Sequence, residues 1–339
     1  MPQPPRNEFY KTAPHNWYND AVRLNPLNGA KLTPAERATL EARTQWMHNK
    51  TILLVGDSTD RFLSMYLCQL GLGGNLSMAP GGRHSSSYCH VDWLNFTAIS
   101  WHVASLYETK PSWWMAKEME FVSWEDRWNK FFMPSLVMGD FSSPVPQPRV
   151  RPDLIVMQSG LWDHNVFVLG KAGQERLEAK TEKEKTAVRP DFTRLLNYRE
   201  LRYYLMRMDK VLGDLQKEFP DTPLLCRSLT QRTNGDQNAG VHQLDVAFAY
   251  ACRRRDVEMM PFGRIVRGLI GIVDLFGDVV HFHEGPISSL YSNILFWYLN
   301  RASGGVEHRG KLVVKATDGP ATTTKFSRCH NYCMLNYPS

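Results

Sequence analysis

TILLVGDSTDRF, residues 51–62, is the stretch of sequence that decides the fold. Its first five residues form a short apolar run, which is typical of a buried strand. Gly56, Asp57 and Ser58 come directly afterwards, and a helix-like pattern continues from Phe62. The stretch therefore predicts a strand, a tight turn and a helix, with the Ser58 hydroxyl above the carboxyl end of the strand.

A serine in this position has the placement of an acyl-transfer nucleophile. The first N–H groups of the following helix would point at negative charge that develops beside it. A hydroxyl becomes a good nucleophile when an imidazole takes its proton and a carboxylate orients that imidazole. Asp278 and His281 offer both groups, and residues three positions apart can face each other. The alternative is that His281 and His283 alternate on a strand end as structural residues.

Strand-like and helix-like segments alternate along the rest of the chain. Further strand-like runs fall at 97–104, 153–158, 223–229 and 257–260, and helices are predicted at 33–48, 199–219 and 286–299. Alternation of this type predicts an α/β fold, a three-layer α/β/α sandwich with a mostly parallel sheet of about five strands. One domain is expected to span residues 1–339.

Two segments are predicted to be insertions into this domain. Residues 171–190 are rich in Lys and Glu, which indicates a solvated helix or mobile loop, with a lid near Gly160 as an alternative. Residues 107–150 carry several tryptophans, among them Trp124 and Trp128. Such rings either fill the core or stack on sugar rings in a carbohydrate groove.

Composition excludes several classes of function. The 339 residues are 43% hydrophobic, and the net charge of +6 is spread along the chain without a nucleic-acid-binding motif. No apolar stretch approaches the length of a membrane span. We expect no cofactor and no metal, because the ligand-type residues around His281–His283 and Cys329–Cys333 lack a second half at the usual spacing.

Cysteines and glycosylation triplets bear on the compartment. The six cysteines allow three disulfides in fifteen possible pairings if the environment is oxidising. Asn49, Asn75 and Asn95 begin triplets that would accept N-glycans in the secretory pathway. The chain is therefore either the lumenal part of a protein whose signal or anchor precedes Met1, or a soluble protein inside the cell.

The motif Gly56-Asp57-Ser58-x-x-Arg61, with Asp278-x-x-His281 before a helix, resembles the SGNH/GDSL hydrolase superfamily. The likeness is greatest to its PC-esterase branch, which includes trichome-birefringence-like and capsule-associated polysaccharide O-acetyltransferases. Residues 153–163 resemble the third block of that family, and the resemblance extends from about Lys50 to Arg301. It implies a nucleophile at Ser58, a base at His281, an orienting carboxylate at Asp278 and a location in the Golgi or outside the cell.

The sequence departs from the superfamily at the oxyanion hole. The third block of the superfamily reads Gly-x-Asn-Asp, but here Trp162 follows Gly160 and Leu161, and Asn165 is the nearest asparagine. Arg61 or a backbone amide is expected to substitute. The glycine of the second block stays open among five candidates, Gly71, Gly73, Gly74, Gly81 and Gly82.

Other polar residues are predicted around the nucleophile. Asp57 is expected to brace the turn through hydrogen bonds. Arg227 either lines the mouth of the site or pairs with a carboxylate. We therefore predict oxyanion or substrate-binding roles for Arg61, Gly160, Trp162, Asn165 and Arg227.

The function predicted is serine-dependent transfer or hydrolysis of an acyl group, expected to be O-acetyl, on a polysaccharide or glycan. A transferase would also need an acetyl donor. The alternative is a carbohydrate-binding or scaffolding protein that keeps the fold without catalysis.

Overall fold

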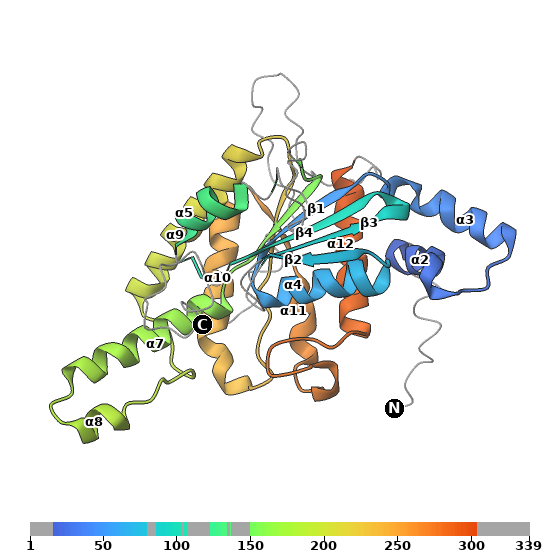
Figure 1. The fold of residues 1–339 in the computed structure, drawn as a ribbon. Coiled ribbons are helices and arrows are strands. Elements are labelled where there is room, and N and C mark those ends of the chain that lie inside the picture. The colour runs from blue at the N-terminus through green and yellow to red at the C-terminus, as the bar shows by residue number, and fades with distance from the viewer. Residues whose placement is uncertain are drawn as a thin grey trace, which may run out of the picture.

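A computed structural model of the protein describes residues 16–79, 86–103, 105–106, 123–133, 136 and 150–303. Its centre is one seven-stranded sheet, and helices cover both faces of that sheet (Figure 1). The predicted three-layer α/β/α architecture is confirmed.

The sheet is mostly parallel. Its strands are β1 (Thr51–Gly56), β2 (Asn75–Met78), β3 (Ser87–Val91), β4 (Phe96–His102), β5 (Leu154–Met157), β6 (Leu224–Arg227) and β7 (Glu258–Met260), in the order β2-β3-β4-β1-β5-β6-β7. β4, β1, β5, β6 and β7 run parallel to one another. At one edge of the sheet, β3 pairs antiparallel with β4, and β2 pairs antiparallel with β3. The carboxyl ends of the parallel strands meet at one edge of the sheet, where loops distant in sequence can converge.

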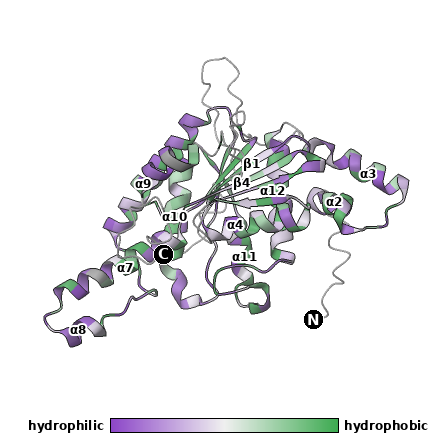
Figure 2. Ribbon diagram, in the orientation of Figure 1, coloured by the Kyte–Doolittle hydropathy of each residue, from purple (hydrophilic) through white to green (hydrophobic). Residues whose placement is uncertain are grey.

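β1 shows how the sheet is buried from both sides. Ile52 and Leu54 pack in one apolar cluster, while Leu53 and Val55 pack in the other. A parallel strand covered on both faces has no polar side, which accounts for the continuous apolar run in the sequence. Figure 2 shows the same contrast across the molecule, with apolar residues on the central strands and polar residues on outlying helices.

Two groups of helices form the outer layers. One face carries α2 (Trp17–Leu24), α4 (Ser58–Met65), α11 (Phe262–Val266) and α12 (Pro286–Ala302), and the other carries α5 (Trp124–Arg127), α9 (Tyr198–Glu218) and α10 (Ala239–Arg254). α3 (Pro34–Thr44) begins at the capping box of Thr33 and Glu36 that its sequence indicates. The helices predicted at 33–48, 199–219 and 286–299 are confirmed as α3, α9 and α12, and the helix predicted after the first turn is α4.

The predicted number of strands was too low. All five predicted strands are present, but β2 and β3 add an antiparallel hairpin next to β4. This hairpin lies at the edge of the sheet, and β2 keeps exposed residues at both of its ends. Edge strands need less apolar surface than central strands, so their sequence pattern is weaker.

The predicted insertion at 171–190 is helical where it is most charged. It contains the second half of α7 (Leu161–Glu178) and the whole of α8 (Glu182–Ala187), which lies away from the sheet (Figure 1). Within 107–150, Trp124 is buried in the core and Trp128 packs against it, so these two rings do not form a sugar groove. The other tryptophans of that segment lie outside the described residues. The single-domain organisation stays a prediction.

Two disulfides join sheet to helices. Cys68 of the helical turn Tyr66–Gly71 pairs with Cys89 of β3, and Cys226 of β6 pairs with Cys252 of α10. The sequence left these pairings open, and Cys329 and Cys333 lie outside the described residues. Two disulfides are consistent with a secreted or lumenal protein.

Candidate active site

The turn after β1 places Ser58 at the first residue of α4. Asp57 caps this helix, because its side chain accepts a hydrogen bond of 2.8 Å from the Thr59 N–H. The expected bracing role of Asp57 is thus confirmed. The Ser58 N–H makes no hydrogen bond in the part of the chain that the structure describes. The amide is therefore open to an oxygen placed beside the serine.

Ser58, His281 and Asp278 form one hydrogen-bonded chain. The Ser58 Oγ lies 2.7 Å from Nε2 of His281, and Nδ1 of His281 lies 2.6 Å from Oδ2 of Asp278. A nitrogen beside a carboxylate carries the proton, so Nδ1 donates to Asp278 and Nε2 accepts from the Ser58 hydroxyl. This arrangement leaves Nε2 ready to take the hydroxyl proton.

A short hairpin holds the aspartate and the histidine. Phe276 and Phe282 are buried, and they pair as an antiparallel bridge at the base of the hairpin. Oδ1 of Asp278 accepts hydrogen bonds of 2.7 Å and 2.8 Å from the backbone N–H groups of Val280 and His281. The carboxylate therefore uses one oxygen to hold the turn and the other to orient the imidazole.

These contacts keep Asp278 charged. Partial burial acts to raise the pKa of Asp278, but hydrogen bonds from the side chain and backbone of His281 outweigh burial and hold that pKa below its ordinary value. An ionised carboxylate at this position stabilises the imidazolium that forms when His281 takes a proton.

Arg227 does not line the mouth of a site. Its side chain is fully buried, and its Nε and Nη2 donate to the two carboxylate oxygens of Asp60 at 2.8 Å and 2.9 Å. Burial opposes the charged guanidinium, but the charge and hydrogen bonds of Asp60 outweigh it and raise the pKa of Arg227. The predicted substrate-binding role is therefore corrected to the alternative, an arginine held by a carboxylate.

This ion pair lies directly beneath the nucleophile turn. Gln158, which follows β5, donates a 2.7 Å hydrogen bond to Asp60. A Cβ at Gly56 would lie 2.0 Å from Oδ2 of Asp60, so only glycine leaves room for that carboxylate. Asp60 thus connects the ends of β1, β5 and β6. This role of Asp60 could not be predicted from local sequence, because Asp60 and Arg227 are 167 residues apart.

Arg61 lies one helical turn beyond Ser58. It is 7% exposed, and its guanidinium lies 4.9 Å from the centre of the Phe62 ring. The same ring contacts the imidazole of His281, with 4.8 Å between centroids. Ser58, Arg61 and Phe62 share one face of α4, as positions three and four residues apart do. Arg61 therefore lies beside the Ser58–His281 pair.

Gly160 permits close packing at the start of α7. A Cβ at this position would lie 2.2 Å from Leu229, so the glycine lets the loops after β5 and β6 meet. Asp163 in the first turn of α7 is buried and accepts hydrogen bonds from Ser159, Ser105 and the Leu106 N–H. Asp163 was missed as a functional position, although it ties the loop after β4 to this helix.

Trp162 and Asn165 are on the first two turns of α7. Trp162 is half-buried, and Asn165 accepts a hydrogen bond from Nη2 of Arg232. Their predicted roles at the oxyanion hole stay predictions. Of the glycines considered for the second block, Gly71 packs against Tyr18 and Gly74 against the Cys68–Cys89 disulfide. Gly81 and Gly82 lie outside the described residues.

His164 is a buried histidine on the same helix. Neither of its ring nitrogens has a hydrogen-bond partner among the described residues, and Gly240 packs against the ring. Burial, and then the charges of Arg232 and Arg194, lower the pKa of His164 to about 4 from its ordinary 6.5. Between pH 4 and pH 6.5, the folded protein therefore keeps this imidazole neutral, whereas the unfolded chain protonates it.

We expect this histidine to make the protein acid-sensitive. Because the unfolded chain binds the extra proton between the two pKa values, stability should fall as the pH drops from 6.5 to 4, by about 2–3 kcal/mol. Urea unfolding at about pH 7.5 and about pH 4.5 would measure the loss, and His164→Gln should remove that share of it. An equal loss in the variant would assign the acid sensitivity to other groups.

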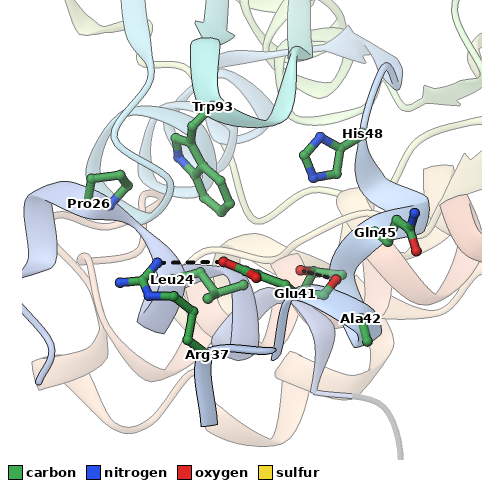
Figure 3. Close-up of a pocket in the computed structure, with 9 residues that line it drawn as sticks. Leu24, Pro26, Arg37, Glu41, Ala42, Gln45, His48 and Trp93 are labelled. Carbon is green, nitrogen blue, oxygen red and sulfur yellow. Dashed lines mark hydrogen bonds and ion pairs between the residues drawn. The ribbon is translucent and has the colours of Figure 1, made fainter. Parts of the chain in front are cut away.

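A pocket lies near the amino end of β1, at the end of this strand opposite to Ser58. Its volume is about 480 Å³, and it is lined by residues before β1 and between β3 and β4, including His48 and Trp93. Trp93 and the Arg37–Glu41 ion pair face each other across it (Figure 3). Since Ser58 follows the other end of β1, this pocket is separate from the candidate active site.

Two features are absent from the described residues. These residues contain no cluster of three or more His, Cys, Asp or Glu side chains that could hold a metal ion. None of the helices within the described ranges is both long enough and apolar enough to span a membrane.

Two of the solved structures that resemble the chain are esterase-like by their descriptions. One is described as a GDSL-like lipase from Parabacteroides merdae, at 12% identity and a TM-score of 0.41, covering 76% of this chain and 97% of that one. The other is an acetylxylan esterase from Geobacillus stearothermophilus, at 9% identity and a TM-score of 0.38, covering 76% and 95%. No protein-family model and no curated protein matches the chain. Likenesses this weak carry no argument about its chemistry.

Proposed function

We propose that this chain is a serine-dependent esterase or acyltransferase. The observation that carries the proposal is the hydrogen-bonded chain from Ser58 through His281 to Asp278, with distances of 2.7 Å and 2.6 Å. A serine, an imidazole and a carboxylate in this order are the parts needed to turn a hydroxyl into a nucleophile.

The reaction proceeds through an acyl-enzyme. Nε2 of His281 takes the Ser58 proton while Oγ forms a bond to the ester carbonyl carbon. The open N–H of Ser58 at the start of α4 donates to the oxyanion. The C–O bond to the leaving alcohol then breaks, and His281 returns the proton to that alcohol. Water or a sugar hydroxyl, deprotonated by His281, then bonds to the acyl carbon, the bond from that carbon to Oγ breaks, and His281 returns the proton to Ser58.

The substrate we propose is an O-acetylated glycan or polysaccharide, and a transferase would also use an acetyl donor. This part rests on the resemblance of Gly56-Asp57-Ser58-x-x-Arg61 and Asp278-x-x-His281 to the PC-esterase branch. The same resemblance supports a place in the Golgi lumen or outside the cell. Asn49, Asn75 and Asn95 are exposed, as N-glycan acceptors must be.

Active-site labelling tests the proposal. A fluorophosphonate probe should react with the purified protein, and peptide mapping should place the label on Ser58. Ser58→Ala should remove the label, whereas Ser289→Ala, a change on α12 of a half-buried serine, should keep it. Absence of label on Ser58, with no acetate released from acetylated glycans, would rule out the proposed chemistry.

A further inference from the structure

Arg61 is a buried cation that lacks a carboxylate partner. Its guanidinium makes no hydrogen bond or ion pair within the described part of the chain, and it lies 4.9 Å from the centre of the Phe62 ring. Burial lowers the pKa of Arg61, and no nearby carboxylate offsets that effect. A buried guanidinium without a partner is costly, so proteins normally pair it with an anion.

Arg61 differs in this respect from Arg227, the other buried arginine near the nucleophile turn. Arg227 is fully buried and is neutralised by Asp60, the residue directly before Arg61. The chain therefore places a carboxylate beneath the nucleophile turn and leaves the next residue's cation beside Ser58 uncompensated. The guanidinium of Arg61 also keeps some access to solvent. Its nitrogens have no hydrogen-bond partner among the described residues, yet none of them is completely buried. A small anion can reach it.

A second arginine at this edge of the sheet has the same character. Arg232, in the loop after β6, is 6% exposed, and its guanidinium donates to the amide oxygens of Asn165 and Gln237 and to no carboxylate among the described residues. The Thr233 N–H in this loop donates to the carbonyl oxygen of Val279, next to Asp278. Two cations without carboxylate partners among the described residues, Arg61 on α4 and Arg232 in the loop after β6, thus lie at this edge of the sheet, which favours a negatively charged substrate.

We propose that Arg61 binds a permanent anionic group of the substrate, and that the esters processed at Ser58 are those of acidic sugars, with a carboxylate near the acyl group. This inference rests on the proposed function and adds the charge of the substrate. A guanidinium can bind a carboxylate through two parallel hydrogen bonds, which would fix the sugar beside the nucleophile. Arg61 would then act mainly on substrate affinity.

Binding is the first test, because it does not depend on catalysis. An O-acetylated methyl glucuronoside and its methyl ester differ by one negative charge and would be titrated calorimetrically into Ser58→Ala. The acid should bind about ten- to a hundredfold more tightly than the methyl ester, the usual worth of a charge-assisted hydrogen bond. Adding Arg61→Gln should abolish that preference, and Arg61→Lys should retain part of it. Arg199→Gln, which changes an exposed arginine on α9, should leave it unchanged.

Kinetics separate this role from a role at the oxyanion. If Arg61 binds the substrate anion, Arg61→Gln should raise KM for the acid and leave the methyl ester unaffected. An equal fall in kcat for the acid and for its methyl ester would instead assign Arg61 to the oxyanion and overturn the proposal. Equal or undetectable binding of the two esters would also overturn it. Failure of fluorophosphonate labelling would refute the proposed function alone, since the calorimetric comparison would still decide the role of Arg61.

Discussion

His281→Ala should lower kcat for ester turnover by about 10⁴- to 10⁶-fold, among the largest effects of any single change in the site. The variant removes the imidazole nitrogen Nε2, which lies 2.7 Å from the Ser58 hydroxyl. The hydroxyl then has no base to take its proton. Ser58→Ala should cost about as much, and the double variant should cost hardly more, because residues that act as one unit are not additive. Release of acetate from an acetylated glycan measures all three.

Asp278→Asn should show a smaller loss, about 10⁴-fold, with the fold intact. The amide can donate to Nδ1 and so favours the tautomer that carries its proton on Nε2, which cannot accept from Ser58. His283→Ala is the matched control, because His283 is exposed two residues away from His281. Activity of His281→Ala within tenfold of the wild type would contradict the assignment of the base.

The parallel part of the fold could be predicted because burial on both faces leaves a strong signal. Residues 51–55 and 153–158 are apolar runs that end in turn residues, and both became central strands. The β2–β3 hairpin could not be predicted in this way. Its strands, Asn75–Met78 and Ser87–Val91, mix polar and apolar residues, and a disulfide from Cys89 supplies part of their anchoring.

The Asp278–His281 pair could be predicted from the sequence, whereas the Asp60–Arg227 pair beneath the nucleophile turn could not. The Asp278–His281 pair could be read from a spacing of three residues, since one turn of chain sets its geometry. The partner of Asp60 could not, because the Asp60–Arg227 contact exists only once β1 and β6 lie in one sheet with β5 between them. The orientation of Asn165 depends likewise on Arg232, which follows another strand. Local motifs carry such information in the sequence, and contacts between strands do not.

Arg227→Met should destabilise the protein by about 3–5 kcal/mol, because it leaves the buried carboxylate of Asp60 without its cation. Asp60→Asn should cost a similar amount, since it leaves the guanidinium of Arg227 uncompensated. Urea unfolding with a constant slope would measure both free energies. The loss should be accompanied by a lower kcat, because Asp60 packs against Gly56 directly before the nucleophile turn.

The surface pair Arg255–Asp209 provides a matched control for this prediction. It has the same two-bond geometry, at 2.9 Å and 2.6 Å, but both side chains are about one-third exposed. Arg255→Met should therefore cost only about 0–1 kcal/mol. Replacing both Asp60 and Arg227 with leucine and methionine should recover much of the stability lost in either single variant, because no buried charge then remains unpaired. A loss at Arg227 no greater than at Arg255, or no recovery in the double variant, would show that burial of charge is not what makes the Asp60–Arg227 pair indispensable.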